Sequence, residues 1–339
     1  MTGRIGMVEG NAVSAGIGSL GARRFVTHGP ALCAVIALSA CAGADRAASS
    51  SDSAASPVTT AAPTLFDDFS YSSPGAMERN GWILRTAQGW PGVPGAIWTG
   101  NVAVGMADPD QAGNRLMRMT ASTDGTTTRQ AQFCHQRKYF EGTYGARVRW
   151  SDAPVSGPDG DQVVQTLYTI APLKAPLDTD YSEMDFEYLP NGGWGSGELT
   201  LFVTTWETFN PEPQWLQINT STQSQGSRAG WHTLVMQVAD GNVTYYIDDE
   251  KLATHGGPYY PEEPMSINFN LWFVRDQLVK STEPRSYQED VDWVFHEVGS
   301  VLSPAQVRQK VADLRAARVR FKDTVRPVDP PLNSACNFY

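Results

Sequence analysis

Short segments rich in β-branched and aromatic residues recur along this chain, and turn-forming residues separate them. After LFDDFS, which begins at Leu65, nine more segments show the pattern: RLMRMTAS, TYGARVRWS, QVVQTLYTIA, EMDFEYL, ELTLFVTTW, HTLVMQVA, NVTYYIDD, SINFNLWFV and VDWVFHEV. Runs of this length and composition predict strands. Nine or more antiparallel strands favour an all-β sandwich or barrel. No repeat of roughly 20 to 50 residues is visible, which argues against a propeller or solenoid.

The end of the chain changes character. Ser303, followed by Pro304 and Gln306, has the pattern of a capped helix start. The apolar residues that follow fall on one helical face: Val307, Val311, Leu314 and Phe321. We therefore expect one short C-terminal helix on an otherwise all-β fold.

Charge and composition restrict the partners. The formal net charge is -10, and no basic block occurs outside the last helix, which argues against a nucleic-acid partner. An uncharged polymer fits that charge better. The many aromatic residues offer contact area to sugar rings as well as to a core. We expect a monomer that needs no cofactor for its activity.

The first 41 residues have the layout of an export signal. Arg23 and Arg24 precede the apolar run ALCAVIALSAC, which is far too short to span a membrane as a helix. The run ends in Leu38-Ser39-Ala40-Cys41, which resembles a bacterial lipobox. Cleavage there leaves Cys41 as a lipidated N-terminus that anchors the protein in the cell envelope. The alternative is an ordinary cleaved signal and a secreted protein.

Composition divides the rest of the chain into three parts. Residues 42–62 are small and polar without hydrophobic periodicity, which predicts a disordered linker. Residues 63–300 hold the strand-like segments and form the expected folded domain. Residues 301–339 contain the expected helix and a tail.

Two of the four cysteines are free to form a structural bond. Cys33 lies inside the signal and Cys41 is the candidate for lipidation. Cys134 and Cys336 remain, and an exported protein reaches an oxidising compartment where a disulfide persists. We expect these two to pair, which would fasten the C-terminal tail to the domain, with two free thiols as the alternative.

The segment YSEMDFEYL places three carboxylates at alternate positions. Side chains alternate across a strand, so Glu183, Asp185 and Glu187 share one face and the apolar residues between them share the other. An exposed face over a core-facing one is the simplest explanation. However, carboxylates about 7 Å apart repel one another, and the segment holds no Lys or Arg to offset this. The arrangement therefore suggests a function.

Glycoside hydrolysis needs two carboxyl groups of this kind, one as an acid and the other as a nucleophile or base. Residues i and i+4 of a strand have Cα atoms about 13 Å apart. Two glutamates leaning together could bring their carboxyls near the ~5.5 Å separation of retaining enzymes. The middle Asp185 would help to keep their pKa values apart.

EMDFE resembles the Glu-x-Asp-x-Glu signature of glycoside hydrolase family 16, the laminarinase, lichenase and xyloglucan transglycosylase group. YGARVRW, GWHTLVMQV, NVTYYIDDEKLATH, PMSINFNLWFV and VDWVFHEV follow the family's order, so the resemblance covers roughly residues 64 to 300. It implies a concanavalin-like β-jelly roll, a sandwich of two antiparallel sheets. It also implies a retaining, endo-acting hydrolase of a β-linked polysaccharide.

Carried over by position, the resemblance implies Glu183 as nucleophile, Glu187 as general acid/base and Asp185 as their electrostatic helper. It also implies aromatic sugar subsites in a cleft. Trp272 is the first candidate, with Trp206 and Trp194 behind it, and packing in the sandwich core is the alternative for each.

Many family members hold a structural calcium on the convex face, and Asp292 in VDWV matches one of its ligands. A plain edge aspartate is the alternative, since one oxygen ligand cannot define a site that takes six to eight.

Two other functions are compatible with the same features. A cell-wall transglycosylase shares the first half-reaction, with an acceptor sugar replacing water. A non-catalytic carbohydrate-binding module shares the fold, although binding alone gives no reason for three crowded carboxylates. The loops PVSGPDGD and APLKAPLDTDYS are long enough to shape the cleft, but no residue in them identifies the polysaccharide.

Overall fold

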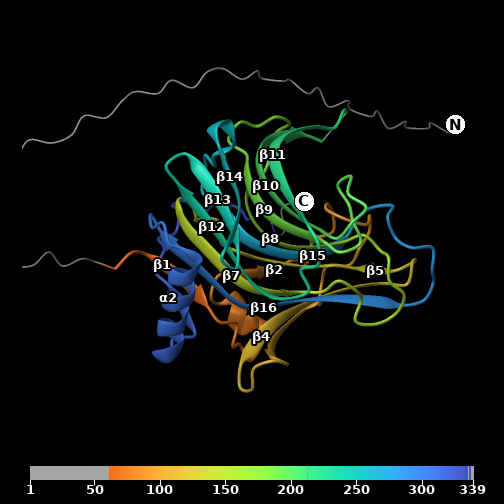
Figure 1. The fold of residues 1–339 in the computed structure, drawn as a ribbon, viewed down its shortest axis with the longest axis horizontal. Helices are drawn as coiled ribbons and strands as arrows, with labels where there is room; N and C mark the ends of the chain where they lie inside the picture. The colour runs from red at the N-terminus through yellow and green to blue at the C-terminus, as the bar shows by residue number, and fades with distance from the viewer. Residues whose placement is uncertain (1–60, 212, 335, 337–339) are drawn as a thin grey trace, which may run out of the picture. The chain divides into compact units, whose positions relative to one another are not determined.

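The computed structural model describes residues 61–211, 213–334 and 336. Within them the chain is built mainly from strands, which form two antiparallel sheets (Figure 1). The expected signal over 1–41, the lipidation candidate Cys41 and all but the last two residues of the expected linker 42–62 lie outside the described residues. Among the described residues, no helix has the length and apolar character to cross a membrane.

The larger sheet has ten strands in the described part of the chain. They are β1 (Thr64–Asp67), β3 (Val102–Ala107), β4 (Arg115–Thr123), β5 (Thr128–Arg129), β7 (Gly142–Trp150), β12 (Gly230–Ala239), β13 (Asn242–Ile247), β14 (Glu250–Gly256), β16 (Arg285–Val298) and β17 (Phe321–Asp323). Seven of them run in the order β14-β13-β12-β7-β16-β1-β17, and β4 joins this path by pairing with β16.

The smaller sheet has seven strands among the described residues. They are β2 (Trp82–Leu84), β6 (Ala131–His135), β8 (Val163–Ala171), β9 (Ser182–Leu189), β10 (Thr200–Asn210), β11 (Leu216–Gln225) and β15 (Ser266–Phe273). Their order is β11-β10-β9-β8-β15-β6-β2, which places the carboxylate strand β9 in the interior of the sheet and β11 at its edge.

The main hydrophobic core lies between the two sheets. Alternation along each strand turns one set of side chains inward, as with Phe186 and Phe269 from the smaller sheet and Val148 and Met236 from the larger one. These side chains belong to one continuous buried cluster. The opposite face of the smaller sheet lies outside this core.

The C-terminal helix covers the outer face of the larger sheet. Besides the short helix α1 (Pro74–Glu78) and a 3-10 turn (Gly257–Tyr259), α2 (Pro304–Ala316) is the only helix in the described residues. Ser303 and Gln306 form the expected capping box. Val307 and Val311 pack against Trp293 of β16 in a second buried cluster, and Figure 1 shows α2 beside β1.

The segment after α2 joins the larger sheet. The expectation that Phe321 lies on the helical face was wrong, because the helix ends at Ala316 and Phe321 begins β17, which pairs with β1. Further on, Cys336 forms a disulfide with Cys134 of β6, with both residues fully buried and their Cα atoms 5.8 Å apart. The tail is thus attached to both sheets.

Candidate active site

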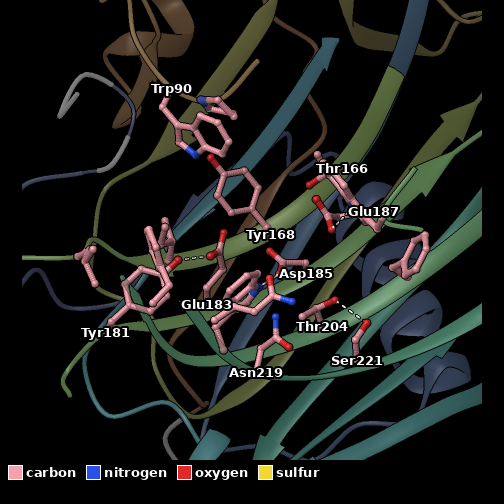
Figure 2. Close-up of a pocket in the computed structure, with 18 of the residues that line it drawn as sticks. Trp90, Thr166, Tyr168, Tyr181, Glu183, Asp185, Glu187, Thr204, Asn219 and Ser221 are labelled. Carbon is pink, nitrogen blue, oxygen red and sulfur yellow. Dashed lines mark hydrogen bonds between the residues drawn. The ribbon is translucent and has the colours of Figure 1, made fainter. Parts of the chain in front are cut away.

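Strand β9 places its three carboxylates on the face of the smaller sheet that is turned away from the core. Met184, Phe186 and Tyr188 are fully buried between the sheets, so the alternating acidic residues must point to the opposite side. There Glu183, Asp185 and Glu187 line one cleft of about 910 Å³. Figure 2 shows the three side chains in a row along the strand, with Asp185 in the middle.

The antiparallel register defines what flanks each carboxylate. Glu187 lies between Thr166 of β8 and Phe202 of β10, and all three line the cleft. Asp185 lies between Tyr168 and Thr204 in the same way.

Glu183 is flanked by Ile170 of β8 and Trp206 of β10. Each carboxylate therefore sits in a row of side chains that crosses the sheet.

Each carboxylate receives one hydrogen bond from an aromatic side chain. The Tyr181 hydroxyl, just before β9, donates to Oε2 of Glu183. The Trp206 indole Nε1 donates to Oδ2 of Asp185 at 3.0 Å. The Trp194 indole Nε1 donates to Oε2 of Glu187, also at 3.0 Å.

The electrostatics differ along the row. Burial raises the pKa of Glu183 to about 7, although hydrogen bonds from Tyr181 and Asp185 act in the opposite direction. Burial and the negative charge of Glu183 raise the pKa of Glu187 to about 8, opposed by the Trp194 hydrogen bond. Burial and the charges of both glutamates raise the pKa of Asp185 well above its usual value. Burial thus favours the protonated form of all three carboxyls, and Glu183 has the most hydrogen bonds that favour its ionised form.

Aromatic rings surround the glutamates. Next to Glu187, the Trp194 ring lies 5.9 Å from the ring of Trp272, which lies 6.5 Å from that of Trp90. A second group near Glu183 joins neighbouring rings 5.2 to 6.0 Å apart and consists of Tyr181, Phe209, Trp206 and Trp215. Trp90 and Trp215 both line the cleft and are each 55% exposed.

All three tryptophans expected to bind sugar line the cleft, but in different ways. Trp272 is only 6% exposed and Trp194 is 45% exposed. The indole of Trp206 donates a hydrogen bond to Asp185, and that of Trp194 donates one to Glu187. The sequence did not indicate these two hydrogen bonds.

Strand β11 contributes cleft residues that sequence reasoning missed. Its alternate residues Gln217, Asn219, Ser221 and Gln223 line the cleft with amide and hydroxyl groups. Ser221 also hydrogen-bonds to Thr204, within 2.9 Å (Figure 2). The sequence LQINTSTQSQ has polar residues on both faces, so no hydrophobic period marked it as a strand. Tyr181, Trp90 and Trp215 were also missed.

The surroundings of Asp292 do not fit calcium. The carboxylate is fully buried and accepts hydrogen bonds from Arg147 at 2.9 Å, Arg315 at 2.7 Å and Asn114 at 2.7 Å. Although burial works to raise it, the pKa of Asp292 is lowered, chiefly by Arg315. Two guanidinium groups thus take the place that a cation would need. Among the described residues, no group of three or more His, Cys, Asp or Glu side chains could hold a metal.

The two antiparallel sheets form a concanavalin-like β-jelly roll, and solved structures of glycoside hydrolase family 16 share this fold. One is a family 16 protein of a Bacteroides ovatus mixed-linkage glucan locus in complex with a G4G4G3G product, with a TM-score of 0.52 and 15% identity. Another is a family 16 endo-glucanase from Bacteroides ovatus in complex with G4G3G-2F-DNP, with a TM-score of 0.51 and 15% identity. Each match covers 68% of this chain and 98% of the other.

A third similar structure concerns endo-acting O-glycanases that members of the human gut microbiota express to initiate mucin breakdown. Its TM-score is 0.50, with 16% identity over 69% of this chain and 98% of the other. No family model matches the sequence, and no curated protein matches it. The similarity at these identities concerns the fold, and the fold expected from the sequence is confirmed.

Proposed function

We propose that this protein is a retaining, endo-acting glycoside hydrolase of the family 16 type that cleaves an uncharged β-linked polysaccharide of the β-glucan class. The observation that carries the proposal is the row of three carboxyl groups in one cleft, each with a different set of hydrogen-bond donors. A binding module would have no use for three crowded carboxyl groups whose pKa values are all raised by burial.

Glu183 is suited to be the nucleophile. It accepts hydrogen bonds from the Tyr181 hydroxyl and from Asp185, and both stabilise its ionised form. Burial raises the pKa of Asp185 well above its usual value, which favours the protonated form that can donate this hydrogen bond. In the first step, a Glu183 oxygen attacks the anomeric carbon and the bond to the glycosidic oxygen breaks, which forms a covalent glycosyl-enzyme.

Glu187 is suited to be the acid and then the base. It has a single indole donor and lies near the charge of Glu183, so it retains its proton longer. That proton passes to the departing glycosidic oxygen in the first step. In the second step the Glu187 carboxylate removes a proton from water, whose oxygen attacks the anomeric carbon and releases Glu183.

The cleft favours an uncharged polymer. Its only ionised or acidic lining groups in the described part of the chain are the three carboxyls and two tyrosines, and no Lys, Arg or His lines it. A sulfate or uronate would meet negative charge there with no cation to pair it. Aromatic faces and the amide-rich face of β11 suit the apolar faces and hydroxyl groups of neutral sugars.

A panel of polysaccharides with the purified protein tests the substrate class. We expect reducing ends to be released from a mixed-linkage or β-1,3-glucan and not from a sulfated galactan or a carboxymethylated form of the same glucan. Rapid loss of viscosity would support internal cleavage, and longer products with an added labelled acceptor would indicate transglycosylation. Equal cleavage of the neutral and carboxymethylated glucans would contradict the proposed substrate class.

We expect a bell-shaped pH profile with its maximum between about pH 7 and pH 8. Activity needs Glu183 ionised and Glu187 protonated. Because burial raises the pKa of Glu183 to about 7, activity falls as the pH drops below this value and protonates the nucleophile. Because burial and Glu183 raise the pKa of Glu187 to about 8, activity falls above it as the acid loses its proton. A measured kcat/KM profile with both limbs below pH 6 would refute this assignment.

A further inference from the structure

We propose that Trp194 is a positioning residue for Glu187: its indole N–H determines which oxygen of the acid carries the proton that is transferred. The proposal rests on the proposed function, because it takes Glu187 as the general acid. Trp194 itself is not assigned to the chemical step.

The first observation is the hydrogen bond itself. The Trp194 indole Nε1 lies 3.0 Å from Oε2 of Glu187. An indole N–H can only donate, so in the protonated acid the proton cannot lie on Oε2 and still face the indole. The carbonyl-type oxygen of a protonated carboxyl is the better acceptor, so this hydrogen bond favours the proton on Oε1, the oxygen that the indole leaves available for transfer. The indole thereby orients the acid for proton transfer.

The second observation is the loop that holds Trp194. Residues 192–195, with the sequence GGWG, have four consecutive positive φ angles of 75°, 147°, 51° and 88°. A Cβ on Gly192 would lie 2.5 Å from the carbonyl oxygen of Ser196, and one on Gly193 would lie 2.2 Å from Cδ2 of Leu189. Only glycine fits these two positions without displacement.

Trp194 itself adopts a left-handed backbone conformation that is uncommon for a bulky residue. Burial does not explain this, because its side chain is 45% exposed. The ring is supported on one side by Trp272 of β15, whose ring centre is 5.9 Å away. The loop thus places an exposed indole against one carboxylate oxygen.

Among the described residues, only the Trp194 indole is seen to donate a hydrogen bond to the Glu187 carboxyl. The neighbours of Glu187 across the strands are Thr166 of β8 and Phe202 of β10. The titratable groups that line the same cleft are Glu183, Asp185, Tyr181 and Tyr168, and no cation lines it in the described part of the chain. Removing the indole therefore removes the one donor that favours the ionised form of Glu187.

The experiment compares Trp194→Phe with the wild type in kcat and in the pH dependence of kcat/KM. Phenylalanine keeps an aromatic ring but has no N–H. We expect the alkaline limb to move up by roughly 0.5 to 1 pH unit and kcat to fall by about tenfold, because the acid loses a hydrogen bond to its charged form and its orientation.

The matched control is Trp90→Phe. Trp90 belongs to the same group of rings and is more exposed, but it donates to no carboxylate among the described residues. This variant should change KM and leave the alkaline limb in place. An unmoved limb in Trp194→Phe, or an equal shift in Trp90→Phe, would overturn the proposal.

A second measurement does not depend on activity. The Trp194 indole ¹H–¹⁵N resonance, assigned by its loss in Trp194→Phe, should shift with pH as Glu187 ionises, and this titration should vanish in Glu187→Gln. If the pH-dependent shift of the Trp194 resonance were the same in Glu187→Gln as in the wild type, the proposal would be rejected, whatever the substrate. A titrating resonance in a protein that cleaves no glycan would instead reject the proposed function and keep the contact.

Discussion

Glu183→Gln is expected to reduce polysaccharide hydrolysis by at least about a thousandfold while leaving the fold intact, because the amide cannot form the glycosyl-enzyme. The substitution is nearly isosteric, and the Tyr181 hydroxyl can still donate to the amide oxygen. Activity on the best glucan of the panel, measured at the pH maximum, provides the test.

The fold of this variant can be checked by its Tm. Burial raises the pKa of Glu183. At pH 8 the folded protein must therefore either take up a proton on this side chain or bury its negative charge, and both lower the free energy of unfolding. A neutral glutamine avoids this penalty, and we expect an equal or higher Tm at pH 8. Glu250→Gln, at the exposed start of β14, is the matched control and should keep full activity. Hydrolysis within tenfold of wild type in Glu183→Gln would exclude Glu183 as nucleophile.

Glu187→Ala is expected to lower glucan hydrolysis by about a hundredfold or more, but to spare the first step with aryl glycosides whose leaving group needs no proton, so that the glycosyl-enzyme accumulates. Azide should restore turnover, because this small anion attacks the glycosyl-enzyme without a general base. The product should then be a glycosyl azide with the anomeric configuration of the substrate, since two displacements have occurred.

Glu183→Ala should behave in the opposite way with azide. The anion occupies the space of the missing nucleophile and displaces the leaving group once, so the glycosyl azide has inverted configuration. NMR of the products distinguishes the two outcomes. If the configurations were exchanged between the variants, the roles of Glu183 and Glu187 would be the reverse of those proposed.

The carboxylate strand was predictable because its signal is local. Two-residue alternation requires Glu183, Asp185 and Glu187 to share a face wherever the segment lies, and the buried Phe186 shows which face is the core. The capping box at Ser303 is local in the same sense. Phe321 was misassigned because helical periodicity does not show where a helix stops. Phe321 lies beyond the helix and begins β17, which pairs with β1.

Strand β11 shows why part of the cleft was not predictable. It lies at the edge of the sheet, with one face in the cleft and little of it in the core, so hydrophobic burial imposes no pattern on Leu216–Gln225. Pairing with β10 makes it a strand, and only that pairing brings Asn219 and Ser221 into the row of the carboxylates.

The alternation of acidic and apolar residues in β9 was enough to place three carboxyl groups together, because it depends only on the geometry of an extended chain. Their separate roles depend on partners from elsewhere: the Trp206 indole from β10 and the Trp194 indole from a glycine loop. The same holds for Asp292, whose partners Arg147 and Arg315 lie 145 and 23 residues away along the chain. Protonation and ion pairing depend on burial and on short distances between remote residues, and these exist only once the two sheets have packed.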